Sequence, residues 1–397
     1  MKTVVLLGDG MGDFPIEEFG NKTPLQIANI PTMRKISANS EVRMVNTVPE
    51  NLPPGSDVAN MAILGYDASK NYTGRAPIEA AGADIPMKDN DIAFRCNLVT
   101  IENGVMKDYS AGHISTSEAS ELIKSLQSEL GSDCFNFHIG VQYRHLLIWK
   151  NGPSDFFCVP PHEISDKHID SFLPEGKYKE QLIKIMEDSK NIFANHPVNK
   201  RRIAEGKSPA TQIWLWGQGA AMQLDSYKDL YGLHGGIITA VDLLKGLAKL
   251  ASLEAPNIEG ANGLINTNYA GKVEAAIEIL QREDFVYVHI EAPDECGHLG
   301  DAKLKVKAIE LFDENVCKPI LEWLEEKGDP YQLILTMDHR TPIKLKGHCS
   351  DPVPMALLKG PIKYMDRKAP FDEYINDGKS QGMAYKWMQE ILEKVRF

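Results

Sequence analysis

Short, uniformly apolar runs rich in Val, Ile and Leu recur along the chain and alternate with amphipathic stretches. A run that is apolar at nearly every position is typical of a strand buried on both faces, as in a parallel sheet. The sequence predicts such strands at residues 3–7, 212–216, 236–239, 285–290, 332–336 and 353–358. Helical patterns separate most of them. The sequence therefore favours an α/β core with a mostly parallel sheet flanked by helices.

Three helices are predicted in this core. The longest runs from about residue 304 to 327 with its apolar side chains on one face, and Pro319 predicts a kink within it. The others cover residues 241–251 and about 381–395.

The middle of the chain has a different pattern, which predicts a smaller α+β domain over residues 114–209. This domain is expected to be inserted into a core formed by residues 1–113 and 210–397. The elements predicted within it are a helix at 117–130, antiparallel strands near 135–139 and 144–149, and a charged helix near 178–191.

Charge and composition narrow the possible partners. A formal charge of −12 over 397 residues disfavours binding to nucleic acid, which needs a basic surface, yet permits a small anion in a locally positive cleft. The six cysteines are dispersed without a CxxC pair, so neither a zinc ribbon nor a disulfide framework is indicated. With no secretory leader and no apolar stretch of ~20 residues, we expect a soluble, cytoplasmic protein that does not enter membranes. The sequence is silent on oligomeric state.

Three aspartates follow apolar runs: Asp9, Asp294 and Asp338. Ligands of open α/β sheets bind at the carboxyl ends of the strands, so these acids are expected to converge from distant parts of the sequence. A single Asp at a strand end is more often a turn former than a ligand. Three of them behind three strand-like runs favour a metal site.

Imidazoles accompany two of these acids. His298 follows Asp294 by four residues, His339 directly follows Asp338, and His348 lies nine residues after His339. A lone His is usually a hydrogen-bonded core residue. Carboxylate and imidazole together suit Mn²⁺ or Zn²⁺ better than Ca²⁺.

Ser56 follows a Pro-Pro-Gly turn and precedes a helix predicted over residues 57–64. Its hydroxyl would lie in the positive field of the helix N-terminus, where a metal would lower its pKa enough to make it a nucleophile. The alternative is plain N-capping of the helix. The neighbouring metal-ligand pattern favours the nucleophile.

These residues lie in motifs that closely resemble the archaeal-type, cofactor-independent phosphoglycerate mutases of the alkaline phosphatase superfamily. The motifs are MKTVVLLGDGMGD, PPGSDVANMAILGYD, YTGRAPIEAAGA, AFRCN, DECGHLGD, TMDHRTP and HCSDPVP, and they span nearly the whole chain. The resemblance implies an alkaline phosphatase-like core with an inserted domain that caps the substrate. It also implies an enzyme that interconverts 3-phosphoglycerate and 2-phosphoglycerate through a phosphoserine.

The same resemblance implies two divalent metal ions, with Mn²⁺ expected and Zn²⁺ or Mg²⁺ as alternatives. One ligand set would comprise Asp294, His298 and His348. The other would comprise Asp9, Ser56, Asp338 and His339.

The substrate is expected to be gripped by cationic side chains. Arg75 and Arg95 are the main candidates because a guanidinium can bind a carboxylate or phosphate with two hydrogen bonds. Arg144 and Lys346 are weaker candidates. For each of them the alternative is a solvated or salt-bridged surface residue.

One segment departs from the family pattern. Mutases commonly carry a segment resembling DRRAGRI, whereas this chain has DYSAGHI, from Asp108 to Ile114, with His113 near its end. Asp108 and His113 are therefore candidate substrate-binding residues. The loss of arginines resembles a bacterial branch proposed to act as a homoserine kinase, which would take a small amino alcohol in place of a phosphorylated acid. No P-loop or other recognised nucleotide motif supports a phosphoryl donor.

Other enzyme classes fit less well. A sulfatase needs a C-x-P-x-R or S-x-P-x-R motif, which the sequence after Ser56 lacks. A plain phosphatase would share the metal site and differ only in letting water reach the phosphoserine. A non-enzymatic metal-stabilised scaffold would have no use for a nucleophile beside the ligands.

Overall fold

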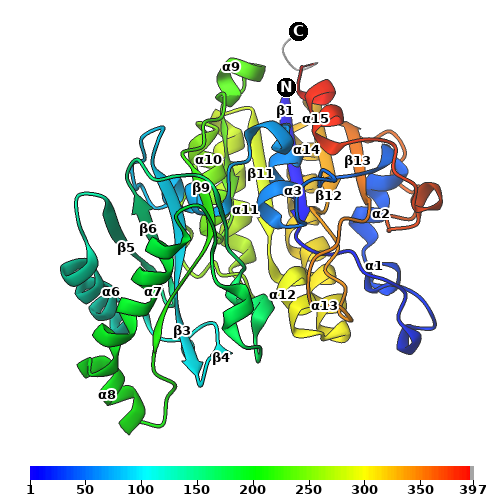
Figure 1. Ribbon diagram of the computed structural model, residues 1–397. Coiled ribbons are helices and arrows are strands. Elements are labelled where there is room, and N and C mark those ends of the chain that lie inside the picture. Colours follow the sequence, from blue (N-terminus) through cyan, green and yellow to red (C-terminus); the bar gives the residue numbers. More distant parts are fainter. Residues whose placement is uncertain (394–397) are drawn as a thin grey trace. The chain divides into compact units, whose positions relative to one another are not determined.

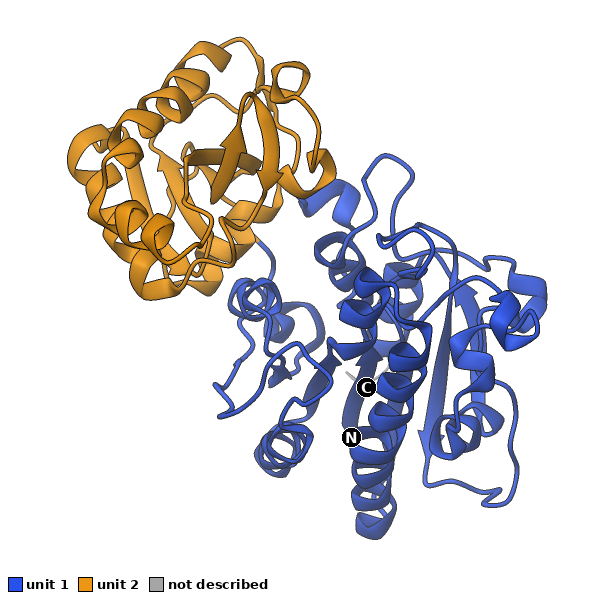
Figure 2. Ribbon diagram, turned by 90° about the horizontal axis from the view of Figure 1, so that it is seen from below, with its two compact units in different colours: residues 1–72, 224–397 blue, residues 73–223 orange. Residues whose placement is uncertain are grey.

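The computed structural model describes residues 1–393. The chain forms two compact units (Figure 2). Unit 1 contains residues 1–72 and the chain from Leu224 onward, and unit 2 contains residues 73–223. The predicted insert at 114–209 lies within unit 2, but this unit extends further in both directions. The reason is that residues 92–102 and 212–220 pair with each other in one sheet.

Unit 1 is built on a six-stranded sheet with the strand order β10-β11-β1-β12-β13-β2. Its strands are β1 (Lys2–Gly8), β2 (Ser40–Val45), β10 (Gly235–Ile238), β11 (Phe285–Ile290), β12 (Tyr331–Thr336) and β13 (Val353–Gly360). The strands β10, β11, β1 and β12 are parallel neighbours, and in Figure 1 β1 lies between β11 and β12. All but two residues of these four strands are buried, which confirms the prediction of a mainly parallel α/β core.

One predicted parallel strand runs the other way. The run at 353–358 forms β13, which is antiparallel to β12. Residues 337–352 connect the two strands without a helix that would return the chain to the opposite end of the sheet. This connection is instead a loop at the carboxyl end of β12.

Helices pack around the sheet of unit 1. They are α1 (Pro24–Ile27), α2 (Pro31–Ala38), α3 (Ser56–Ile63), α4 (Ala68–Asn71), α9 (Tyr227–Tyr231), α10 (Asp242–Leu250), α11 (Tyr269–Arg282), α12 (Ala292–Leu299), α13 (Ala302–Phe312), α14 (Lys318–Lys327) and α15 (Ala384–Glu393). The helix predicted over 304–327 is interrupted by a π-helical segment, Asp313–Cys317, just before Pro319 in the first turn of α14. The last predicted helix corresponds to α15, and its final two expected positions lie outside the described residues.

Unit 2 has a five-stranded antiparallel sheet. Its strands are β3 (Ile92–Glu102), β4 (Val105–Asp108), β5 (Phe135–Val141), β6 (Arg144–Trp149) and β9 (Gln212–Ala220), and a small hairpin pairs β7 (Phe156–Phe157) with β8 (Glu175–Gly176). Its helices are α5 (Arg75–Gly82), α6 (Thr116–Leu130), α7 (Lys179–Ala194) and α8 (Pro197–Ala204). The run at 212–216 was expected in the parallel core, but it forms β9, antiparallel to β3. Apolar clusters involve both faces of this sheet, so its strands have the all-apolar pattern of parallel strands.

Within residues 1–393, no helix combines the length and the apolar character needed to cross a bilayer.

Candidate metal centre

The topology of unit 1 brings the three predicted aspartates together. Asp9 directly follows β1, Asp338 lies two residues after β12, and Asp294 lies in the first turn of α12 after β11. Because β11, β1 and β12 are adjacent parallel strands, their carboxyl ends meet at one edge of the sheet. All three side chains are buried.

A first ligand group contains Asp9, Asp338 and His339, whose donor atoms all lie within 4.8 Å of one another. The His339 Nε2 atom is 3.5 Å from Asp9 Oδ1 and 3.4 Å from Asp338 Oδ2. The Asp338 carboxylate is oriented by three donors, the backbone N–H groups of Gly10 at 3.0 Å and His339 at 2.8 Å and the Asn60 side-chain amide at 2.9 Å. These contacts fix the orientation of this carboxylate within the group.

Ser56 lies beside this group. It is the first residue of α3, and the N-cap is Gly55, so Ser56 does not have the N-capping role considered as its alternative. Its Oγ is 3.1 Å from His339 Nε2. Asn60, one turn further along α3, donates to the Ser56 carbonyl at 2.8 Å. Asn60 thereby links the serine to Asp338.

A second group contains Asp294, His298 and His348. The helix α12 places Asp294 and His298 one turn apart, with Asp294 Oδ2 3.1 Å from His298 Nε2. The His348 Nε2 atom, from the loop after β12, is 3.1 Å from His298 Nε2 and 3.6 Å from Asp294 Oδ1. Donor atoms of Asp294, His339 and His348 also lie within 4.8 Å of one another. His339 therefore lies between the two groups.

The charge of the cluster suits divalent cations. Burial, reinforced by the carboxylates of Asp338 and Asp294, holds the pKa of Asp9 well above its usual range. The Asp9 Oδ1 atom is buried without a hydrogen-bond partner. A buried carboxylate that repels its neighbours and has an unpartnered oxygen fits a cation ligand, because a cation removes both penalties.

The imidazoles have contrasting environments. Burial alone would lower the pKa of His298, but its hydrogen bond with Asp294 raises that pKa to about 9. Burial would raise the pKa of Asp294, yet hydrogen bonds with His298 and His348 hold it well below its usual range. Burial lowers the pKa of His339 to about 4, so at neutral pH this ring is uncharged and has a lone pair for a metal.

Two further residues donate hydrogen bonds to the aspartates of the site and were not predicted from the sequence. Asn60 is fully buried, and its side-chain oxygen accepts from Tyr287. Thr341 donates to Asp294, and its Oγ1 is 3.2 Å from His339 Nδ1. Asn60 lies four residues after Ser56, on the same face of the helix, and Thr341 lies two residues after His339. These spacings could have identified both residues as neighbours of the site.

Lys346, a predicted substrate contact, also belongs to unit 1. Its backbone has a left-handed conformation, with φ of 53°, and its carbonyl accepts a hydrogen bond from His298 Nδ1 at 3.0 Å. The main chain of this residue therefore orients a histidine of the second group.

The predicted arginines belong to unit 2 and surround one carboxylate. The Glu79 side chain lies 2.9 Å from Arg75 Nε and 3.1 Å from Arg95 Nε. Burial would raise the pKa of Glu79, but the charges of Arg95, Arg75 and Arg144 lower it. Burial together with the charges of Arg75 and Arg144 lowers the pKa of Arg95 to about 10, despite Glu79. The charges of all three arginines therefore act on the Glu79 carboxylate, and two of them, Arg75 and Arg95, contact it directly.

Asp108 and His113 have local contacts in unit 2. The Asp108 carboxylate accepts from the Ser110 backbone and hydroxyl and from the Gly112 N–H, at 2.7, 2.6 and 2.7 Å. It stabilises a loop in which His113 has a positive φ of 48°. The His113 ring contacts Tyr143 edge to face, with 6.5 Å between centroids. These contacts give Asp108 a structural role in the loop.

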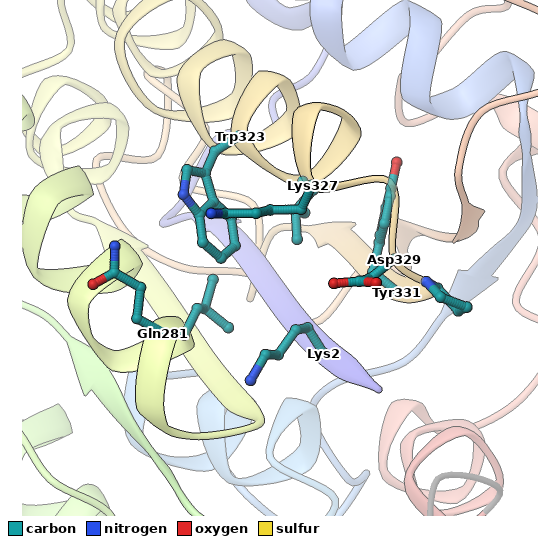
Figure 3. A pocket seen from close by; sticks show the side chains of 9 residues that line it. Lys2, Gln281, Trp323, Lys327, Asp329 and Tyr331 are labelled. Carbon is teal, nitrogen blue, oxygen red and sulfur yellow. The ribbon is translucent and has the colours of Figure 1, made fainter.

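A separate cavity of about 200 Å³ lies at the opposite end of the unit 1 sheet (Figure 3). Its wall includes Lys2 and Tyr331, the first residues of β1 and β12, together with Trp323 and Lys327 from α14. The aspartates follow the other ends of these strands. This cavity is therefore distinct from the metal centre.

The chain is similar to known proteins over the length of both units. The family model of 2,3-bisphosphoglycerate-independent phosphoglycerate mutase matches residues 37–199. The chain is 47% identical over 385 residues to the protein of that name from Methanosarcina mazei, covering 97% of each chain. It is 46% identical over 402 residues to a probable one from Geobacter sulfurreducens, covering 99% of this chain and 100% of that one. A solved structure from Pyrococcus horikoshii matches with a TM-score of 0.80 and 26% identity, covering 100% of this chain and 97% of the other.

Proposed function

Because the chain belongs to the 2,3-bisphosphoglycerate-independent phosphoglycerate mutase family, we propose that it interconverts 3-phosphoglycerate and 2-phosphoglycerate through a phosphoserine on Ser56. The observation that carries the covalent step is the position of the Ser56 hydroxyl, 3.1 Å from His339 and beside two groups of carboxylates and imidazoles. A serine outside such a cluster would lack the means to lose its proton at neutral pH.

The proposed metal ligands are the two groups described above. Asp294, His298 and His348 would hold one ion, and Asp9, Ser56, Asp338 and His339 the other. Mixed oxygen and nitrogen donors suit Mn²⁺ or Zn²⁺, and we propose Mn²⁺, with Zn²⁺ or Mg²⁺ as alternatives, because of the resemblance to the mutase family. When bound, such ions neutralise the phosphoryl oxygens and stabilise the alkoxide form of a serine.

The residues of the chain would act in two transfers. In the first, the Ser56 Oγ–P bond forms as the O–P bond of the substrate ester breaks, and the leaving oxygen takes up the equivalent of the proton lost by the serine. In the second, the other hydroxyl of the same glycerate attacks the phosphoserine, so that a new O–P bond forms as the Ser56 Oγ–P bond breaks, and the equivalent of the proton lost by this hydroxyl returns to Ser56 Oγ. Asn60 would hold Ser56 and Asp338 in fixed relative positions through both steps, since its amide donates to the Ser56 carbonyl and to the Asp338 carboxylate.

Unit 2 would bind the anionic groups of the substrate, in the role of a substrate-capping domain. Support comes from within that unit, where the charges of Arg75, Arg95 and Arg144 act together on the Glu79 carboxylate and lower its pKa. The Arg95 guanidinium also lies over the Trp216 ring, 4.4 Å from its centroid, which limits its rotamers. Such an oriented guanidinium suits a phosphate or carboxylate. Lys346 and His113 stay predicted substrate contacts.

The homoserine kinase alternative has no support from the similar proteins described above. It was raised by the missing arginines between Asp108 and His113. Proteins 46–48% identical over nearly the whole chain are named phosphoglycerate mutases, so the altered segment does not by itself indicate a change of substrate. A cytoplasmic location stays a prediction.

The decisive experiment incubates Mn²⁺-loaded protein with 3-phosphoglycerate and, separately, with homoserine and ATP, and follows products by ³¹P NMR. We expect 2-phosphoglycerate without inorganic phosphate. Release of phosphate would indicate a phosphatase, and O-phosphohomoserine as the sole product would contradict the mutase function.

The nucleophile is tested by Ser56→Ala. We expect turnover to be abolished while the protein still holds metal, whereas the control Ser69→Ala, at an exposed serine elsewhere in unit 1, keeps full activity. Turnover retained by Ser56→Ala would remove the phosphoserine mechanism.

A further inference from the structure

A chain of buried polar residues leads to Asp9 from the side of β11. It consists of Lys272 from α11, Glu291 at the end of β11, and His289 within β11, and these side chains are 0%, 4% and 0% exposed. Lys272 Nζ is 2.6 Å from Glu291 Oε2 and donates to the His289 carbonyl at 3.1 Å. His289 Nδ1 is 3.2 Å from Glu291 Oε1.

The Glu291 carboxylate is held by several donors at once. Besides Lys272 and His289, it accepts from the Thr239 hydroxyl at 3.0 Å and from the Ala240 backbone at 2.7 Å. A buried ion pair is tolerated only when its remaining hydrogen-bonding capacity is satisfied in this way. Glu291 is therefore a rigid acceptor that fixes the orientation of the His289 ring.

The other ring nitrogen of His289 points to the metal centre. His289 Nε2 lies 3.1 Å from Asp9 Oδ2, within ion-pair distance, but this contact lacks hydrogen-bond geometry, and Nε2 is buried without a hydrogen-bond partner. The pairing of β1 with β11 explains this approach, because Gly8 is the register partner of Ile290. With Oδ2 beside His289, the unpartnered oxygen Oδ1 is the one that lies 3.5 Å from His339.

We infer that His289, oriented by Glu291 and Lys272, is a positioning residue that holds the Asp9 carboxylate so that Oδ1 faces a divalent cation. The inference rests on the proposed role of Asp9 as a metal ligand. The polar contacts of the His289 side chain are with Asp9, Glu291 and Thr239, so it acts on the site through Asp9. Outer partners of metal ligands typically change metal affinity by about 10- to 100-fold when they are removed.

The test measures Mn²⁺ binding by calorimetry to metal-stripped wild-type protein and to the variants His289→Gln and Glu291→Gln. Val288→Ala is the matched control, since it removes packing from the same strand without touching a polar partner of Asp9. We expect wild type to bind two ions. Each polar variant should weaken one of them by about 10- to 100-fold and leave the other near its wild-type affinity.

A second readout separates positioning from damage to the fold. In His289→Gln, excess Mn²⁺ should restore kcat while the KM for 3-phosphoglycerate stays at the wild-type value, and Val288→Ala should keep both ion affinities even if it melts at a lower temperature. Unchanged affinities in His289→Gln and Glu291→Gln, or equal weakening of both ions in all three variants, would overturn the inference. If wild type binds no Mn²⁺, the proposed metal centre fails as well, so the two failures are distinguishable.

Discussion

Lys305 is a buried cation that joins the two loops carrying Asp9 and Asp338, two of the proposed metal ligands. Its side chain is fully buried, and Nζ donates to the carbonyls of Gly12 and Thr341, both at 2.8 Å, and to Asp13 Oδ2 at 3.0 Å. Gly12 belongs to the loop after β1, and Thr341 to the loop after β12. Substituting Lys305→Met keeps much of the volume but leaves the Asp13 carboxylate without its cation and the two carbonyls without this donor.

The expected cost follows from this geometry. Removing one partner of a buried ion pair costs about 3–5 kcal/mol, chiefly because the other charge stays buried without compensation. We therefore expect Lys305→Met to lower the free energy of unfolding of the metal-free protein by about this amount, measured by urea denaturation with far-UV circular dichroism. Lys303→Met, at an exposed lysine of the same helix, is the matched control and should unfold like wild type.

A double variant isolates the physical cause. If the loss of stability in Lys305→Met comes mainly from the unpaired Asp13 carboxylate, the double variant Asp13→Asn/Lys305→Met should lose clearly less free energy of unfolding than the two single variants lose in sum. Additive costs would refute the reasoning, and so would a loss below about 1 kcal/mol in Lys305→Met, which would mean that water reaches Asp13.

Two further predictions concern Glu373 and Asn60. Burial raises the pKa of Glu373 from 4.5 to about 7 in the folded state. Between pH 4.5 and about 7 the folded protein therefore holds a proton that unfolding releases. The free energy of unfolding should fall by up to about 3 kcal/mol as the pH rises through this range. Glu373→Gln should lose less stability than wild type between about pH 4.5 and 8 in urea titrations, and parallel pH responses would contradict this. Asn60→Asp replaces the donor to Asp338 with a second buried carboxylate; we expect kcat to fall at least about tenfold while the fold persists, and wild-type turnover would show that Asn60 does not position Asp338.

Most residues of the candidate site could be predicted from the sequence, because they occur in pairs at short, fixed spacings along the chain. Asp294 and His298 are one helical turn apart, and His339 adjoins Asp338, so each motif carries its own geometry wherever the fold places it. The apolar runs before the acids located the strand ends. The rule that parallel strands present their carboxyl ends at one edge then led to the expected convergence.

Strand direction and partners needed the tertiary structure. The run at 353–358 was expected to be parallel and is antiparallel, and the run at 212–216 belongs to unit 2. An all-apolar run reports burial on both faces, and that burial is the same in either direction and in either unit. The pattern therefore contains no information on which neighbour completes the hydrogen-bond ladder.

The same distinction holds for the contacts that orient the site. The sequence by itself determined the types of the candidate ligands, their spacing and the position of the serine, since these depend on neighbours along the chain. Only the tertiary structure decided that Lys272, Glu291 and His289 form a chain of contacts leading to Asp9, and that Arg75 and Arg95 pair with Glu79. Such partners are chosen by strand pairing and by the need to satisfy every buried charge, and both act between residues far apart in the sequence.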